Sequence, residues 1–132
     1  MQKKYRLAKR EHFHIVFKYG KSVVNHQFVL YYRSSRHIEH FRLGVSVSKK
    51  IGNAVVRNRI RRKMKEIVRL HKDEVARGYD LIMIARKPVT EMDYHQMEKS
   101  ILHILRKASI INIGKKNTHR KSSTLSADET TT

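Results

Sequence analysis

Cationic side chains crowd the stretch from residue 49 to 72, KKIGNAVVRNRIRRKMKEIVRLHK. It holds ten lysines and arginines against a single acid, Glu66. Guanidinium groups donate paired hydrogen bonds to phosphate oxygens, so an arginine-rich run of this kind points to phosphate binding. A helix face whose only task is to be solvated usually mixes charge signs, whereas Arg57, Arg61 and Lys65 follow at intervals of four and repel one another. We therefore interpret the stretch as a binding face for a polyanion.

The same stretch has the periodicity of a helix. Gly52-Asn53 indicates a loop, and the Asn53 side chain is a good N-cap because its carbonyl accepts an orphan backbone N–H. An apolar stripe then recurs at helical spacing: Val56, Ile60, Met64, Ile67 and His71. The neighbouring stripe is cationic: Arg57, Arg61, Lys65, Arg69 and Lys72. The sequence predicts a helix with an apolar underside, whose N-terminus adds a second anion site beside Lys49 and Lys50.

The composition of the whole chain agrees with a nucleic-acid partner. The 132 residues carry a net charge of +19, far more than solubility needs. No apolar run is long enough to span a bilayer, the basic N-terminus lacks the apolar core of a signal peptide, and cysteine is absent. We expect a cytoplasmic protein of one domain with no membrane partner.

The remaining segments predict an α+β domain. A first helix is expected over 9–18, strands over 27–33 and 41–48 with a hairpin loop at 34–40 between them, a strand covered on both faces over 79–86, and a last helix beginning at Thr90 with Asp93 at its capping-box position. The order is α-β-β-α-β-α, with room for one more short strand near the second, and the helices pack against the sheet. The domain spans 1–113, and the Ser/Thr/Lys-rich segment 114–132 is predicted to be a disordered tail.

Two interpretations of the aromatic residues Phe13, Phe17 and Tyr31 remain open. Phenylalanines four residues apart on a short helix usually pack in a core. Yet the strand at 27–33 already has Phe28, Leu30 and Tyr32 for its core side, and Tyr31 points to the other face. Aromatic rings on an open sheet face stack unpaired bases, so beside so much positive charge a stacking platform is the second interpretation.

The sequence offers little for chemistry by the protein itself. The nine histidines show no helical spacing typical of a metal site, and no glycine-rich phosphate loop is present. We interpret two acidic pairs, Asp73/Glu74 and Glu91/Asp93, as surface groups, in preference to a role in holding Mg²⁺. We expect no catalytic residue and no protein metal site.

Four segments in this order resemble the protein component of bacterial ribonuclease P. They are LGVSVSKKIGNAVVRNRIRR (43–62) with an Arg-Asn-Arg signature at Arg57, Asn58 and Arg59, FHIVFKYGKS (13–22), QFVLYY (27–32) and DLIMIARKP (80–88). The resemblance covers about residues 5–110 and leaves out the C-terminal tail.

The resemblance implies that catalysis belongs to a partner RNA, which uses Mg²⁺ to cleave precursor tRNA at the 5′ end of the mature tRNA. The protein would lower the Mg²⁺ requirement and need no further protein partner. Its central cleft would hold the single-stranded 5′ leader through Phe13, Phe17, Tyr31, Lys49, Lys50, Arg57 and Asn58. The catalytic RNA would bind Arg59, Arg61, Arg62, Lys65 and Arg69. The family fold also implies a mixed sheet with a left-handed β-α-β crossover.

Two other functions compete with this one. A stand-alone RNA-binding or ribosome-associated protein would need the basic face alone, so its aromatic residues would matter for stability only. A protein-only ribonuclease would cleave RNA without any RNA cofactor, and the residues offer it almost nothing.

Overall fold

Seven main elements build the fold in the computed structural model, which describes residues 2–35 and 38–111. They are α1 (Arg10–Tyr19), β1 (Lys21–Val24), β2 (Phe28–Ser34), β3 (Arg42–Val47), α2 (Ala54–Leu70), β4 (Tyr79–Ala85) and α3 (Tyr94–Lys107). Four short 3₁₀ segments precede or link them: η1 (Lys3–Tyr5), η2 (Lys49–Ile51), η3 (Lys72–Glu74) and η4 (Lys87–Glu91). The α+β class and the order of the six predicted elements are confirmed. A fourth strand does exist, but β1 precedes the strand predicted at 27–33, whereas the additional strand was expected near the strand at 41–48. The segment 114–132 predicted to be a disordered tail lies outside the described residues.

The four strands form one mixed sheet in the order β1-β2-β4-β3. β4 pairs antiparallel with β2 and parallel with β3. The predicted hairpin between β2 and β3 at 34–40 is therefore wrong. β4 is the most apolar strand, and a central place covers both of its faces and pairs both of its edges. The hairpin that does form joins β1 to β2, where the Asn25 side chain accepts hydrogen bonds from the backbone N–H groups of Gln27 (3.0 Å) and Phe28 (2.8 Å).

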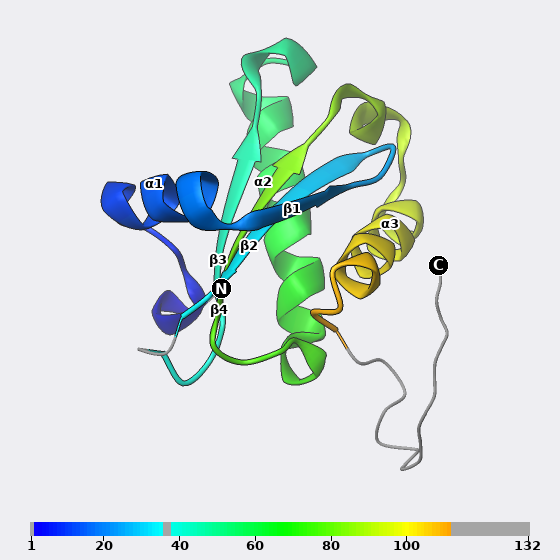
Figure 1. The fold of residues 1–132 in the computed structure, drawn as a ribbon. Helices are drawn as coiled ribbons and strands as arrows, with labels where there is room; N and C mark the ends of the chain where they lie inside the picture. The colour runs from blue at the N-terminus through cyan, green and yellow to red at the C-terminus, as the bar shows by residue number, and fades with distance from the viewer. Residues whose placement is uncertain (1, 36–37, 112–132) are drawn as a thin grey trace, which may run out of the picture.

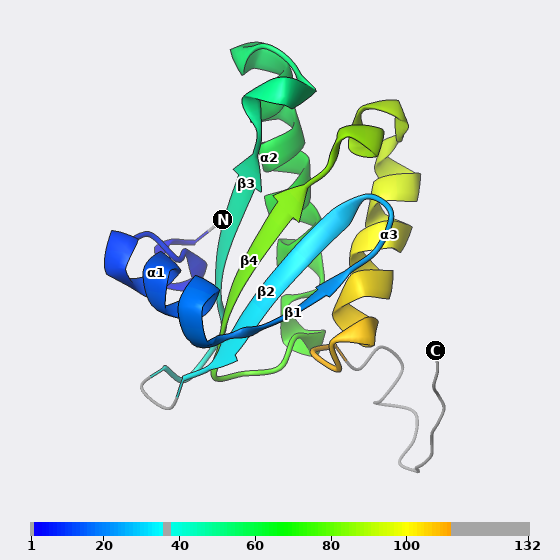
Figure 2. The same ribbon diagram turned by 45° about the horizontal axis from the view of Figure 1, so that its top comes forward.

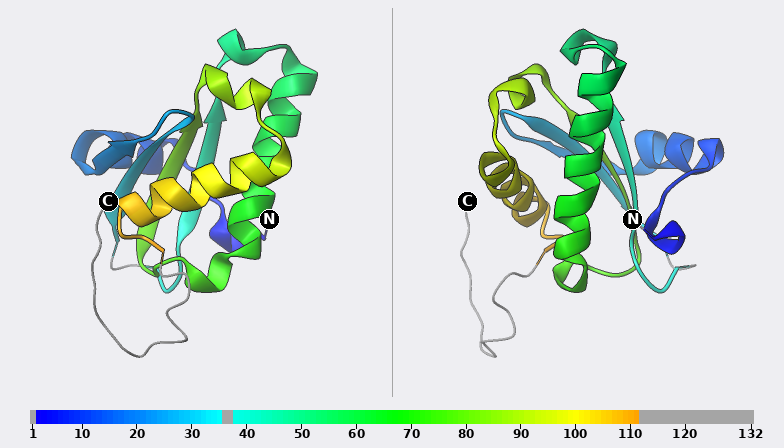
Figure 3. Two further views of the ribbon diagram at one scale, coloured as in Figure 1. Left: turned by 90° about the vertical axis from the view of Figure 1, so that its right-hand side faces the viewer. Right: turned by 180° about the vertical axis from the view of Figure 1, so that it is seen from behind.

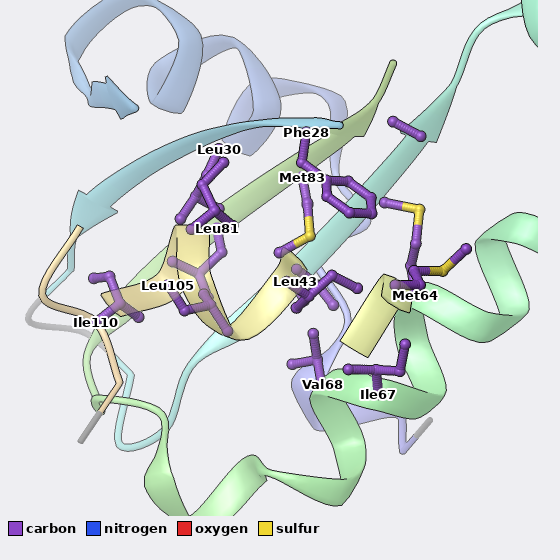
Figure 4. Packing of buried hydrophobic residues seen from close by; sticks show 14 of the residues in the cluster. Phe28, Leu30, Leu43, Met64, Ile67, Val68, Leu81, Met83, Leu105 and Ile110 are labelled. Carbon is purple, nitrogen blue, oxygen red and sulfur yellow. The ribbon is translucent and has the colours of Figure 1, made fainter. Parts of the chain in front are cut away.

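Helices cover both faces of this sheet (Figures 1 and 2). α2 and α3 pack on one face and bury the main core, which Figure 4 shows from close by. That core joins sheet residues to residues of both helices, including Phe28, Leu30, Leu43, Leu81, Met83, Met64, Ile67, Val68, Ile104 and Leu105. α1 covers part of the other face, where Leu7, Val16 and Ile82 form a smaller buried cluster. Phe28, Leu30 and Tyr32 thus face the main core, whereas Tyr31 belongs to the α1 side, as predicted.

The connection from β3 through α2 to β4 is left-handed. In Figure 1 both strands point upward, and β4 lies to the right of β3. The view from behind shows α2 on the near side of the sheet (Figure 3, right). Such crossovers are nearly always right-handed, so this feature of the fold lies outside what a residue pattern predicts. Along the chain, η2 leads from the C-terminal end of β3 to the N-terminus of α2.

The ends of α2 and α3 show which capping residues act. Asn53 caps α2 as predicted, accepting a hydrogen bond from the backbone N–H of Val56 at 3.0 Å. The predicted start of the last helix at Thr90 is wrong, because α3 begins at Tyr94 with Asp93 as its N-cap. Asp93 accepts from the Gln96 N–H at 2.8 Å, and the Gln96 side chain accepts from the Asp93 N–H at 2.9 Å. The Thr90 hydroxyl instead donates to the carbonyl of Lys87 within η4.

His71 fastens the end of α2 to α3. Its Nδ1 lies 2.8 Å from Glu74 and its Nε2 lies 2.9 Å from Glu98, so both ring nitrogens meet a carboxylate. Partial burial works against the charged imidazolium, but the hydrogen bonds to Glu98 and Glu74 outweigh it and raise the pKa of His71 above its ordinary 6.5.

This arrangement predicts a pH-dependent stability. Because the pKa of His71 is raised on folding, its contribution is fully present below pH 6.5 and is lost as the pH rises through the folded-state pKa. We expect the free energy of unfolding in urea to fall across that window, and His71→Asn to remove this part of the fall. His95→Ala, at an exposed site, is the control that keeps it. An unchanged pH profile in His71→Asn would contradict the assignment.

Candidate nucleic-acid interface

Most cations of α2 have no acidic partner among the residues that the structure describes. Of the ten in 49–72, only Arg69 forms an ion pair among the residues the structure describes, with Glu66 at 2.7 Å. The hydrogen bond from Arg69 also holds the pKa of Glu66 below its ordinary value. Arg57 donates through Nε to the carbonyl of Gly52 at 3.1 Å, and Arg61 donates to the side chain of Asn58. Ile60, Met64 and Ile67 are buried as predicted, so the helix does present a cationic outer side above an apolar underside.

The N-terminal segment adds to this cationic surface. Arg6 forms an isolated parallel β-bridge with Leu43, and the Leu7 N–H donates to the Leu43 carbonyl at 3.0 Å. The segment therefore lies along the free edge of β3. The Tyr5 ring contacts Phe41, with ring centroids 4.9 Å apart, and the Lys72 ammonium lies 5.8 Å from the Tyr5 ring. Lys3, Lys4 and Arg6 thereby come next to the C-terminal end of α2. The sequence indicated a basic N-terminus but not this position, which depends on pairing with a distant strand.

The predicted aromatic residues meet on the face covered by α1. Phe17 and Tyr31 are in edge-to-face contact, with centroids 4.9 Å apart, and Phe17 is 44% exposed. Phe13 is more enclosed and packs against the buried cluster of Leu7, Val16 and Ile82. Its ring tip touches Gly44, where an added Cβ would lie 2.5 Å from the ring. The two open interpretations therefore divide between the phenylalanines: Phe13 supports α1, and Phe17 with Tyr31 offers an accessible aromatic edge.

On this face, a strip of bare sheet lies between the aromatic pair and the cations at the N-terminal end of α2. Tyr31 pairs across the sheet with Ile82, and Ile82 with Gly44. The next row toward the C-terminal end of β3 comprises Ser46, Ile84, Val29 and Val24. Ser46 and Val24 are exposed, and Val29 and Ile84 are half-buried. We call this row the open strip. The chain rises about 13 Å from Gly44 to Ser48, a length that a few nucleotides can contact.

The other four residues predicted for the leader cleft, Lys49, Lys50, Arg57 and Asn58, stand beyond the open strip. Lys49 and Lys50 in η2 are exposed, and the Ser48 hydroxyl accepts a hydrogen bond from the Lys50 N–H at 3.1 Å. The first turn of α2 follows at once, so its positive dipole end adds to these charges. Asn58 is exposed and Arg57 half-buried in that first part of the helix. The structure thus gathers one set of predicted residues at the N-terminus of α2 and the aromatic set near α1.

Two further cations at this end were missed by the sequence analysis. Arg86 and Lys87 are exposed and follow β4 directly. Because β3 and β4 are parallel, their C-terminal ends share one edge of the sheet, and η2 and η4 lie in contact there. The Arg86 guanidinium is held by a hydrogen bond to the carbonyl of Asn25 at 2.9 Å. The sequence does show two basic residues directly after a buried strand. Their place beside η2 can be inferred only once β4 is known to run parallel to β3.

The described residues contain no cluster of three His, Cys, Asp or Glu side chains able to hold a metal ion. Of the acidic pairs considered in the sequence, Glu74 is engaged by His71 and Asp93 caps α3. Nor does any described helix have the length and apolar character needed to cross a membrane.

Comparisons with known proteins give a consistent result. The family model described as Ribonuclease P matches residues 1–109. The ribonuclease P protein component of Bacillus cereus strain B4264 is 47% identical over 115 residues, which cover 87% of this chain and all of that protein. A solved structure of the Staphylococcus aureus RNase P protein has 44% identity, covers 82% of this chain and 98% of its own, and superposes with a TM-score of 0.77. The RNase P protein of Thermotoga maritima has 33% identity, covers 77% and 96% of the two chains, and has a TM-score of 0.72.

Proposed function

The chain belongs to the ribonuclease P protein family, and from this premise we propose that it binds the single-stranded 5′ leader of precursor tRNA beside the catalytic RNA. Members of the family are protein components that work with an RNA subunit in the 5′ maturation of tRNA. The chain is such a subunit of the ribonuclease P holoenzyme, which is an endoribonuclease.

One observation supports the proposed leader site most strongly. An accessible aromatic pair, Phe17 and Tyr31, and a set of unneutralised cations flank the same bare strip of sheet. Aromatic faces stack unpaired bases of any sequence, and cations beside them hold the backbone phosphates. A double helix hides its base faces in its own stack, so this pairing of features suits a single strand.

We divide the interface into two surfaces. The leader surface comprises Phe13, Phe17, Tyr31, Lys49, Lys50, Arg57 and Asn58, extended by Arg86 and Lys87. The RNA-subunit surface comprises Arg59, Arg61, Arg62, Lys65 and Arg69. Within the first surface Phe13 acts through packing, since it holds α1 against Gly44 and so positions Phe17.

The proposed effect on catalysis is electrostatic. The RNA subunit and the precursor tRNA are both polyanions and repel each other, and a subunit with a net charge of +19 between them reduces that repulsion. Less Mg²⁺ is then needed to bring the two RNAs together. We assign the Mg²⁺ to the RNA, as membership of the ribonuclease P protein family implies, and no step passes through a protein-bound ion. We also place the protein in the cytoplasm, with no obligatory protein partner.

The proposal is tested by measuring precursor-tRNA cleavage at low Mg²⁺ with the protein alone, the cognate RNA subunit alone and the two together. We expect correct 5′ processing to be far faster with both. Cleavage by the protein alone would overturn the assignment of catalysis to the RNA. The protein's acceleration of cleavage is also compared between a precursor with a full leader and a precursor with a minimal leader. If the acceleration is no greater for the full leader, the leader site itself is refuted.

A further inference from the structure

Tyr19 is an exposed aromatic residue that the leader surface does not use. It is the last residue of α1, and 63% of it is exposed to solvent. It belongs to neither buried cluster. A tyrosine ring left in water forgoes the burial that normally stabilises it, so packing does not explain this position.

Two cations lie over the Tyr19 ring. The Lys18 ammonium is 5.5 Å from the ring centroid, and the Arg33 guanidinium carbon is 5.9 Å from it. Lys18 precedes Tyr19 in the chain, whereas Arg33 comes from β2, so the fold assembles the cluster. Lys21 begins β1 two residues after Tyr19 and is also exposed. The cations hold the ring in place and supply phosphate ligands around it.

No acid neutralises these cations within the described part of the chain. Neither Lys18, Lys21 nor Arg33 forms an ion pair there. The acid across the sheet from Arg33 is Asp80, and both of its carboxylate oxygens already accept hydrogen bonds from Arg42, at 2.8 and 2.9 Å. The cluster therefore has the same character as the leader surface, an aromatic ring surrounded by unpaired positive charge.

The cluster lies close to the aromatic pair along three separate chain segments. Tyr19 is two residues from Phe17, Arg33 is two residues from Tyr31, and Ser22 of β1 pairs with Tyr31. β1 is an edge strand, so no further strand of the described structure borders the sheet on this side. A strand of RNA leaving Phe17 and Tyr31 over this edge would meet Tyr19, the last residue of α1.

We propose that Tyr19, framed by Lys18 and Arg33, is an additional stacking site for single-stranded RNA, occupied by leader nucleotides beyond those held at Phe17 and Tyr31. The inference rests on the proposed function, because it assigns a further stretch of the same leader. Its occupant is an unpaired segment, since only an unpaired base has a free face for the ring. The site makes affinity depend on leader length beyond the first few nucleotides.

The test measures the affinity of the reconstituted holoenzyme for precursor tRNAs with no leader, a leader of about 4 nucleotides and a leader of about 12, lengths within the range that single-strand binding sites span. Tyr19→Ala is expected to weaken binding of the longest leader by about 5- to 20-fold, the lower part of the range for the loss of one base stack. Tyr19→Phe keeps the ring and is expected to restore it. Leu70→Ala removes a comparably exposed apolar side chain elsewhere and serves as the matched control.

The outcomes separate this inference from the function on which it rests. If the wild-type holoenzyme gains no affinity from any leader, the proposed function fails. If leaders increase affinity and Phe17→Ala reduces it, but Tyr19→Ala binds the longest leader like the wild type, only the Tyr19 site is refuted. A loss in Tyr19→Ala that is equal for all leaders, including none, would also refute it, because Tyr19 would then contact the RNA subunit.

Discussion

Replacing Arg61, Arg62 and Lys65 with glutamine is expected to weaken binding of the RNA subunit about 100-fold at 0.15 M salt. Each phosphate contact releases condensed counterions, which is worth about fivefold in affinity at this salt relative to 1 M. The five cations assigned to the RNA subunit predict a slope of log K against log salt of about −3.5 to −4.5. Removing three of them should make that slope shallower by about 2 to 3. The three side chains lie on one side of α2 and have no acidic partner in the described structure.

The matched control removes the same charge from another surface. Arg77, Lys99 and Arg106 are exposed and lie outside α2, two of them on α3. Their triple replacement with glutamine lowers the net charge equally and should leave the slope nearly unchanged. Filter binding or fluorescence titration over about 0.1–0.5 M salt measures both variants. Equal losses in the two would mean that overall charge, rather than the cationic side of α2, determines the affinity.

Phe17→Ala and Tyr31→Ala are expected to lower the affinity for precursor tRNA selectively, by about 5- to 150-fold each, because a stacked base is worth about 1–3 kcal/mol. Mature tRNA lacks the leader and should bind the variants like the wild type. The two losses should not add, because the rings touch each other and each removal disturbs the same contact. The measurement is the ratio of precursor to mature affinity in the holoenzyme at one fixed salt concentration.

Folding must be separated from binding in these variants. Phe17 is 44% exposed, so its truncation should cost little of the free energy of unfolding, which urea titration measures. Tyr31→Phe keeps the ring and is the conservative control. A protein that needs only its basic face would show a stability loss and an unchanged precursor-to-mature ratio. That result would favour a general RNA-binding protein in which these two aromatic residues only stabilise the fold.

Much of this protein is determined by its local sequence. The amphipathic pattern of 54–70 fixes both the buried stripe of α2 and its cationic side, because a regular helix turns residues at intervals of three and four to one face. The alternation in 28–34 likewise places Phe28 and Leu30 in the core and Tyr31 opposite, since successive side chains of a strand point to opposite faces. The four segments that resemble the ribonuclease P protein are local too, and the family assignment follows from them.

The tertiary structure decided what local patterns leave open. A strand pattern does not name its partner, so the insertion of β4 between β2 and β3 appears only when the most apolar strand takes the centre. Two residues could have capped the last helix. Asp93 and Gln96 together hydrogen-bond two backbone N–H groups at its start, and Thr90 hydrogen-bonds neither of them.

The extended interface likewise depends on pairing between distant segments. The N-terminal cations reach α2 because Arg6 bridges to Leu43, and Arg86 with Lys87 reaches η2 because β3 and β4 are parallel. Arg33 reaches Tyr19 because the β1–β2 hairpin folds back toward α1. The sequence by itself determined the charge, the helix faces and the aromatic residues. Which of them act together was decided by long-range pairing, whose free energy depends on burying the whole sheet at once.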